Sequence, residues 1–258
     1  MTTEITTLAT RLDDAARNCL PEHQLSADHD LSLAEAYQVQ HALVARRLDR
    51  GETRVGVKLG FTSRAKAAQM GVSDVIIGQL TSEMHLEDGA GIWLGAYVHP
   101  RAEPEVAFRL AADLDPRRWT GNVTETVDAV APALEIIDSR YRDFRFNLAD
   151  VVADNTSAAG FVVGAWQPLP RSLDNRGVVL EVDGRVAESG STAAILGDPL
   201  RAVTAAIRLA AAHDIPLRAG DVLLAGAGTP AVTLTASSTV TAAVSGLGRV
   251  RVRVTSAR

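Results

Sequence analysis

Two carboxylates that could do chemistry stand two residues apart in the stretch RAEPEVAFRL: Glu103 and Glu105, with Pro104 between them. In a strand, residues i and i+2 point to the same face. Burying two neighbouring acids on one face is costly unless a cation, a basic side chain or a shared proton compensates for their charge. The basic residues nearby in this stretch are Arg101 and Arg109.

A third acid, Glu135, lies in the apolar run APALEIID. Three carboxylates in apolar surroundings could supply the oxygen ligands that Mg²⁺ or Mn²⁺ prefers. The alternative is a solvated strand face whose acids pair with arginines, and composition alone favours it because acids usually lie at the surface. Pro104 cannot donate a ladder hydrogen bond, so its strand is expected at an edge, a bulge or a strand end.

Several other stretches contain residues that could have either a structural or a functional role. Lys58, in RVGVKLGF, either reaches the surface or is held inside for chemistry. The polar residues 154–157 predict a turn with side-chain-to-backbone bonds. The glycine-rich residues 226–230 could present N–H groups to an anion, but they lack a nucleotide-binding spacing. Cys19 is expected to be a buried structural thiol, and the six scattered histidines suggest no catalytic triad.

Composition bounds the class of protein. The 258 residues are 47% apolar, enough for a sizeable core. The net charge is −5 and basic residues do not cluster, which argues against nucleic-acid binding. No window approaches the roughly 20 apolar residues of a membrane span, and the acidic N-terminal stretch does not resemble a secretory signal. With a single cysteine, the protein is expected to be cytoplasmic.

Apolar periodicity and turn residues predict few helices and many strands. Helices are expected over residues 4–19, 33–50, about 123–133 and about 199–213. Ser32 and Glu35 have capping-box spacing, and Gly51 is suited to end the second helix. Short β-rich runs follow from about residue 54, so we expect an α+β, mostly β protein with an N-terminal helical region, 1–53, and a mainly β body, 54–258.

Four stretches in this order resemble the hydratase/decarboxylase branch of the fumarylacetoacetate hydrolase family, from about residue 30 to the C-terminus: GVKLGFTSRAKAAQMGV, PRAEPEVAF, PALEIIDSRYRDFRFNLADVVADNTSAAGFVVG and AGDVLLAGAG…VSGLGRVRV. The resemblance implies a mostly β, partly barrel-like body. It also implies a metal ion, Mg²⁺ or Mn²⁺, held here by Glu103, Glu105 and Glu135. It further implies that Lys58 is catalytic and substrate-binding, and that Ser157 is substrate-binding.

Two activities occur in this branch. Hydratases add water to 2-hydroxypenta-2,4-dienoate (2-keto-4-pentenoate), and decarboxylases form that compound from 2-oxohex-3-enedioate (4-oxalocrotonate) in meta-cleavage catabolism of aromatic compounds. The discriminating stretch is GVSDVIIGQL. Hydratases resemble one another in having an acidic residue two positions before the last glycine of the corresponding stretch, where this chain has Ile76. An aliphatic side chain there resembles decarboxylases, although Val75 replaces an expected proline. An apolar wall also favours release of a carboxylate as CO₂.

The resemblance therefore implies a Mg²⁺-dependent carboxy-lyase. In its mechanism, the C1 carboxylate and C2 oxygen of the substrate chelate the metal, and a dienolate forms as CO₂ leaves. Lys58 would neutralise the C1 carboxylate or the enolate oxygen, and Ser157 would bind a carboxylate. Arg140 would either hold the distal carboxylate or pair with Asp138 or Asp143.

Three alternatives remain at this point: a dienoate hydratase, an acylpyruvate C–C hydrolase, and a non-catalytic partner subunit. The intact acids and lysine argue against the last, and the hydrolase lacks a good water-activating histidine. A homo-oligomer and a complex with a dienoate hydratase are the expected assemblies.

Overall fold

The computed structural model describes residues 3–63 and 74–256. Its helices are α1 (Thr3–Asn18), α2 (Leu33–Asp49), α4 (Val123–Thr126), α5 (Leu148–Ala153) and α6 (Leu200–Ala212). Its strands are β1 (Arg54–Gly60), β2 (Ile76–Thr81), β3 (His85–Leu86), β4 (Gly91–Trp93), β5 (Arg101–Leu110), β6 (Val127–Ile137), β7 (Ala158–Val163), β8 (Gly177–Val182), β9 (Arg185–Ser191), β10 (Val222–Ala227), β11 (Val232–Thr233), β12 (Thr239–Val244) and β13 (Gly248–Thr255). The stretch 62–72, part of the family resemblance, lies mostly outside the described residues.

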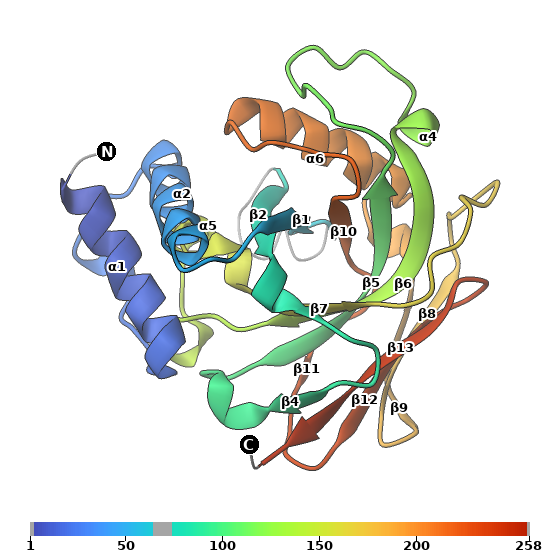
Figure 1. The fold of residues 1–258 in the computed structure, drawn as a ribbon. Helices are drawn as coiled ribbons and strands as arrows, with labels where there is room; N and C mark the ends of the chain where they lie inside the picture. The colour runs from blue at the N-terminus through green and yellow to red at the C-terminus, as the bar shows by residue number, and fades with distance from the viewer. Residues whose placement is uncertain (1–2, 64–73, 257–258) are drawn as a thin grey trace.

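Within the described ranges, the strands form two sheets. The larger has the order β2-β1-β10-β5-β6-β7-β3, with β11 pairing beside β5. The smaller, β4-β13-β12-β8-β9, packs against β5, β6 and β7. Figure 1 shows the larger sheet curling, with α6 over β1, β2 and β10. The expected α+β, mostly β and partly barrel-like fold is confirmed.

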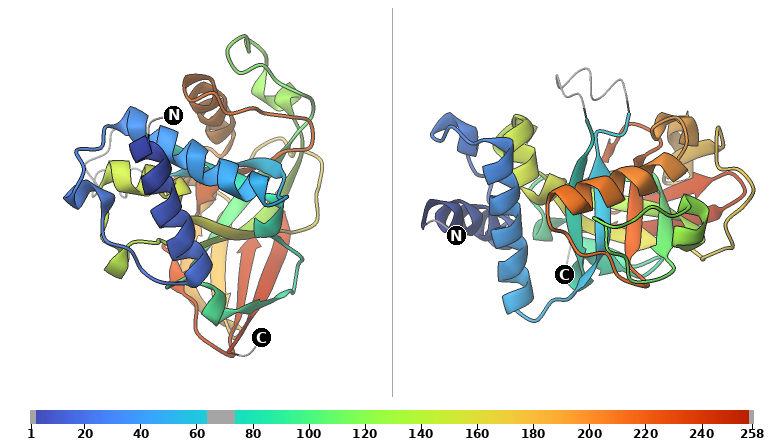
Figure 2. Two further views of the ribbon diagram at one scale, coloured as in Figure 1. Left: turned by 60° about the vertical axis from the view of Figure 1, so that its left-hand side comes forward. Right: turned by 90° about the horizontal axis from the view of Figure 1, so that it is seen from above.

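The N-terminal helices lie together at the β2 end of the larger sheet, as both views in Figure 2 show. The capping box of Ser32 and Glu35 is confirmed, and Gly51 follows α2 with a left-handed φ of 98°. One apolar cluster runs from α1 and α2 into β1, β2 and α6. The first strand begins at Arg54, but because the core is shared across this point, the division at residues 53 and 54 stays a prediction.

One feature of the N-terminal part refines the expectations. Cys19 follows α1 directly but is half-buried rather than buried, and burial raises the pKa of its thiol. A raised pKa keeps the thiol protonated and makes it a poor nucleophile.

None of the described helices is both long enough and apolar enough to cross a membrane.

Pro104 interrupts the ladder inside the sheet rather than at its edge. β5 lies between β6 on one side and β10 and β11 on the other. The pairing with β10 shifts register just before Ala227↔Glu105, and β11 then takes over at Val232↔Ala102. The carbonyl of Pro104 accepts from Gly228 N on this side, at 2.8 Å. The side of Pro104 that lacks an N–H therefore faces the register shift between β5 and β10. A bulge of this kind was one of the three positions expected for the proline.

The helix expected over about 123–133 is wrong beyond its first turn. Asn122 caps α4, which ends at Thr126, and β6 begins at Val127. Pro132 would remove a hydrogen bond from a helix interior and clash there. In β6 almost every residue is buried, so its apolar residues do not alternate with polar ones and the period-2 signal is lost.

Arg140 is a structural residue, and its expected role in holding a distal carboxylate is wrong. Its buried guanidinium pairs with Asp154 and donates to the carbonyls of Asp138, Asp154 and Ala158. The partner is thus Asp154, rather than the side chain of Asp138 or Asp143. These contacts join the segment after β6 to the turn before β7, and that turn lines the site described below.

Arg140→Met should lower the free energy of unfolding by about 3–5 kcal/mol, because Asp154 loses its buried partner. Burial already raises the pKa of Asp154 to about 6. A protonated Asp154 needs no cation, so the deficit should shrink between about pH 8 and about pH 5. Denaturant unfolding at both pH values measures it. Arg109→Met, which breaks the exposed pair with Asp128, is the control and should cost less than about 1 kcal/mol. An equally small effect of Arg140→Met would contradict the structural role.

Candidate active site

Three glutamates meet on neighbouring strands of the larger sheet. Glu103 and Glu105 lie two residues apart in β5, and Glu135 of β6 is directly opposite Glu103 in the ladder. One oxygen of each carboxylate lies within 4.8 Å of the others, and all three residues are buried. The solvated strand face considered above is therefore wrong. Like charges directly opposite in a ladder are destabilising, so this arrangement requires compensation.

Lys58 of β1 provides part of that compensation. Its side chain is 4% exposed, and Nζ lies 3.0 Å from Oε2 of Glu135. Nζ also donates to the carbonyl oxygen of Thr156 at 3.1 Å. The lysine is thus held inside the protein and does not reach the surface. The three carboxylates and one ammonium carry a formal charge of −2 when all are ionised.

The curl of the sheet brings Lys58 to Glu135. The order β1-β10-β5-β6 places their strands three positions apart. In a flat sheet this corresponds to about 14 Å, at roughly 4.8 Å per strand. A lysine and a glutamate standing perpendicular to such a sheet would not meet. Closure of the concave face reduces the gap to an ion pair, so the barrel-like curvature is a requirement of the site.

Burial sets the electrostatics of the cluster. Removal from water raises the pKa of Glu105 well above its usual value, and the charge of Glu135 adds to the effect. Burial likewise raises the pKa of Glu135, although Lys58 opposes the shift. Burial alone would lower the pKa of Lys58, but the surrounding glutamates outweigh it and hold that pKa above its usual value. The lysine is therefore an ammonium, and the ionised forms of Glu105 and Glu135 are less favourable than those of carboxylates in water.

The glycine-rich segment after β10 supports Glu105. Gly226 N donates to Oε2 of Glu105 at 2.7 Å, and Gly228 N donates to the strand carbonyl of Pro104. These N–H groups bond within the protein, so they are not an anion site. Gly226 has a φ of 112°, and a Cβ there would lie 2.0 Å from Oγ1 of Thr62. This position therefore requires glycine.

The predicted turn at residues 154–157 is confirmed, and it reaches across to β2. Asn155, Thr156 and Ser157 all have left-handed φ values of 48–57°. Asn155 accepts from Gln79 N and donates to Gln79 O, which fastens the turn to β2. Left-handed residues other than glycine are strained and persist only where surrounding contacts hold them. Here they place the carbonyl of Thr156 on Lys58.

A cavity of about 460 Å³ opens beside the cluster. Lys58, Glu103 and Ser157 line it, together with Ile76 and several aromatic and aliphatic side chains. A smaller cavity of about 300 Å³ also touches Lys58 and Glu103, on the side of the glycine-rich segment. The cavity wall at Ile76 is aliphatic, as the sequence indicated.

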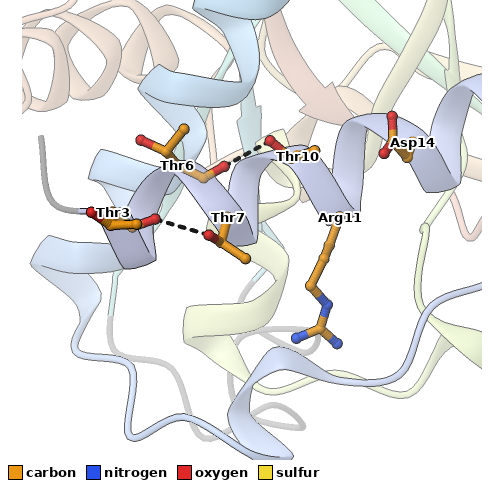
Figure 3. A pocket seen from close by; sticks show the side chains of 6 residues that line it. All are labelled: Thr3, Thr6, Thr7, Thr10, Arg11 and Asp14. Atoms are coloured by element: carbon orange, nitrogen blue, oxygen red, sulfur yellow. Dashed lines mark hydrogen bonds between the residues drawn. The ribbon is translucent and has the colours of Figure 1, made fainter.

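Another hollow of similar volume follows the exposed side of α1 and carries no such chemistry. Figure 3 shows it lined by Thr3, Thr6, Thr7, Thr10, Arg11 and Asp14. The hydroxyls of Thr7 and Thr10 donate to helix carbonyls one turn earlier, and Arg11 pairs with Glu22. It therefore lacks a buried reactive group.

Of the five site residues expected from the sequence, the structure brings Glu103, Glu105, Glu135 and Lys58 into one cluster and places Ser157 at the cavity beside it. Sequence reasoning missed the contribution of two other groups. Asn155 holds the turn through a long-range contact that no local pattern reveals. Arg101 also lines the cavity. Its i, i+2 spacing from Glu103 was the available signal.

Comparison with known proteins identifies the family of this chain. The family model described as fumarylacetoacetate (FAA) hydrolase C-terminal matches residues 53–255. The chain is 50% identical to a 4-oxalocrotonate decarboxylase from Pseudomonas sp., over 99% of this chain and 100% of that protein. It is 36% identical to a 2-keto-4-pentenoate hydratase from Paraburkholderia xenovorans, over 86% of this chain and 84% of that one.

A solved structure is similar along almost the whole chain. This is the 4-oxalocrotonate decarboxylase from Pseudomonas putida G7, complexed with magnesium and adipate. The TM-score is 0.93 and the identity 36%, with 98% of each chain covered. On the extent of the family match and of these relatives, the chain belongs to the fumarylacetoacetate hydrolase family.

Proposed function

We propose that this protein is a Mg²⁺-dependent decarboxylase that converts 2-oxohex-3-enedioate (4-oxalocrotonate) to 2-hydroxypenta-2,4-dienoate and CO₂. The observation that carries the proposal is a cavity lined by Lys58, Glu103 and the aliphatic Ile76, with Glu103 belonging to a buried triad of glutamates. The full-length relative at 50% identity, named for this activity, supports it.

The donor set fits a hard divalent cation. Apart from the Lys58 ion pair, Oε1 of Glu105 and both oxygens of Glu135 are buried without a hydrogen-bond donor. A charge of +2 balances the formal −2 of the cluster. Carboxylate oxygens are the ligands that Mg²⁺ and Mn²⁺ prefer. Glu103, Glu105 and Glu135 would hold the ion. When bound, it supplies a Lewis acid and a template for the substrate's 2-oxo acid end.

The chain's own residues then bind, orient and shield the substrate. The Lys58 ammonium lies where negative charge develops as CO₂ leaves, and a fixed cation in a dry site stabilises that charge without reorganising. Ser157 lines the cavity within reach of a substrate carboxylate. Ile76 places an apolar surface in the wall, which favours formation of neutral CO₂ and offers no group to activate water.

The rival activities lack a supporting group in the cavity. A hydratase needs a general acid or base near the vinyl carbon, and at the discriminating position this chain has Ile76. An acylpyruvate hydrolase needs a base to activate water, and no histidine is among the described residues that line the cavity. The chain is 36% identical to a hydratase, and the substrates of the two activities share a 2-oxo acid end.

The surroundings of the enzyme belong to the same proposal. We expect a homo-oligomer in the cytoplasm and a complex with a dienoate hydratase that consumes the unstable product. Size-exclusion chromatography with light scattering tests the first expectation, and co-purification with a hydratase tests the second.

A paired assay with Mg²⁺ tests the reaction. One arm offers 2-oxohex-3-enedioate and measures CO₂ release, and the other offers 2-hydroxypenta-2,4-dienoate and follows its ultraviolet absorbance. We expect CO₂ release without consumption of the dienoate. Consumption of the dienoate without CO₂ release would make the protein a hydratase.

Glu105→Gln should abolish Mg²⁺-dependent turnover, because it removes one anionic ligand. It should also weaken Mn²⁺ binding, measured by calorimetry, by at least about tenfold, roughly 1.4 kcal/mol. The metal-free variant should be no less stable than the metal-free parent, because one buried charge is gone. Glu87→Gln, at an exposed position, is the control. Unaltered activity of Glu105→Gln with added Mg²⁺ would remove this residue from the ligand set.

Lys58→Met should reduce kcat by at least roughly tenfold, about 1.4 kcal/mol of transition-state stabilisation. Mn²⁺ binding should be retained or tightened, because a competing positive charge leaves the cluster. Steady-state kinetics and calorimetry on the same preparation separate the two effects. Unchanged kcat would assign Lys58 a purely structural role.

A further inference from the structure

We propose that Arg101 binds the distal carboxylate of a dicarboxylic substrate and so selects six-carbon diacids over monoacids. The inference rests on the proposed function and names the group that recognises the far end of the substrate. Arg101 is the first residue of β5 and lines the larger cavity.

Arg101 shares its strand face with the metal-binding acids. It precedes Glu103 by two residues and Glu105 by four, and all three lie in β5. The β5–β6 ladder runs without a register shift from Arg101↔Ile137 to Glu103↔Glu135, so the alternation of faces is kept. Side chains two apart in a strand point to the same side. The arginine is therefore the first side chain of a row that continues with Glu103 and Glu105.

Among the residues that the structure describes, the guanidinium of Arg101 has no anionic partner. Its Cζ lies 4.0 Å from the centre of the Phe144 ring, which also lines the cavity. It makes no ion pair or hydrogen bond with any residue in the described ranges. Lys58, the other cation among the described residues that line the cavity, is already paired with Glu135 and donates to Thr156. A guanidinium that lies over an aromatic ring still has N–H groups available to bind an anion.

The spacing fits the substrate. Two residues of a strand advance about 6.6 Å. In an extended six-carbon diacid the two carboxyl carbons lie roughly 6 Å apart, with bonds of about 1.5 Å. A diacid whose 2-oxo acid end lies at the glutamates thus places its other carboxylate beside Arg101. A five-carbon dienoate, which lacks that carboxylate, gains nothing from the arginine.

The contact should act on binding rather than on the chemical step. A guanidinium binds a carboxylate through two parallel hydrogen bonds and fixes its plane. As C5–C6 breaks, that carboxylate becomes neutral CO₂, so the ion pair weakens in the transition state. Interactions that are stronger in the ground state lower KM and do not raise kcat. Loss of Arg101 should therefore raise KM and leave kcat equal or higher.

The rival explanation is packing alone, with Arg101 covering Phe144. Arg109 allows a matched comparison, because it lies on the same strand with the same alternation and its guanidinium lies 5.5 Å from the Trp166 ring. Arg109 pairs with Asp128 and is outside the cavity lining. Arg109→Met removes an arginine–aromatic contact without touching the cavity.

Calorimetric titrations in saturating Mg²⁺ test the proposal with adipate, hexanoate and pyruvate as probes. The wild-type protein should bind adipate at least tenfold more tightly than hexanoate. Arg101→Met should abolish that difference and leave the Kd of pyruvate unchanged, since pyruvate carries only the proximal end. Arg101→Lys should restore part of the difference, and Arg109→Met should resemble the wild type.

Equal binding of adipate and hexanoate by the wild type, or a preserved difference in Arg101→Met, would overturn the proposal. An unchanged KM for a diacid in Arg101→Met would do the same while leaving the decarboxylase assignment intact. Conversely, the wild-type protein could release no CO₂ while Arg101→Met abolishes the preference for adipate. That pair of results would refute the reaction and support the recognition site. The two failures are therefore distinguishable.

Discussion

Three buried carboxylates on one pair of strands, with the Lys58 ammonium beside them, form the constraint on which the rest of the structure depends. Directly opposed acids repel each other, and burial raises the pKa values of Glu105 and Glu135. One lysine cannot neutralise three acids. A divalent cation would balance this charge, so a destabilising feature of the metal-free protein is also the proposed metal site.

The surrounding elements can be understood as ways of holding that cluster. Curvature of the larger sheet brings Lys58 across three strand positions to Glu135. The glycine-rich segment gives Glu105 a backbone donor, and the strained turn at residues 155–157 gives Lys58 an acceptor. Arg140 and Asn155 fix that turn from inside the protein. Except for the pair of Arg140 with Asp154, these contacts join segments that are far apart in the sequence.

Much of this could be predicted from the sequence, and the failures have physical causes. The i, i+2 acids, the capping box of Ser32 and the lysine in an apolar run are local signals, and the family resemblance placed the acids together. The helix expected over about 123–133 was wrong because β6 is buried on both faces and shows no alternation. Arg140 was misjudged because charge alone does not reveal a buried partner. Only the register of β5 and the position of Phe144 show Arg101 to be an uncommitted cation in the cavity.

The most direct test of the central claim is a crystal structure of the protein grown with Mn²⁺, with data collected for anomalous scattering. We expect one strong anomalous peak in contact with carboxylate oxygens of Glu103, Glu105 and Glu135, with the Lys58 ammonium beside it. A peak elsewhere, or an intact cluster with no peak at saturating Mn²⁺, would contradict it. In that case the three acids would not be metal ligands, and the fold alone would hold them together against their mutual repulsion.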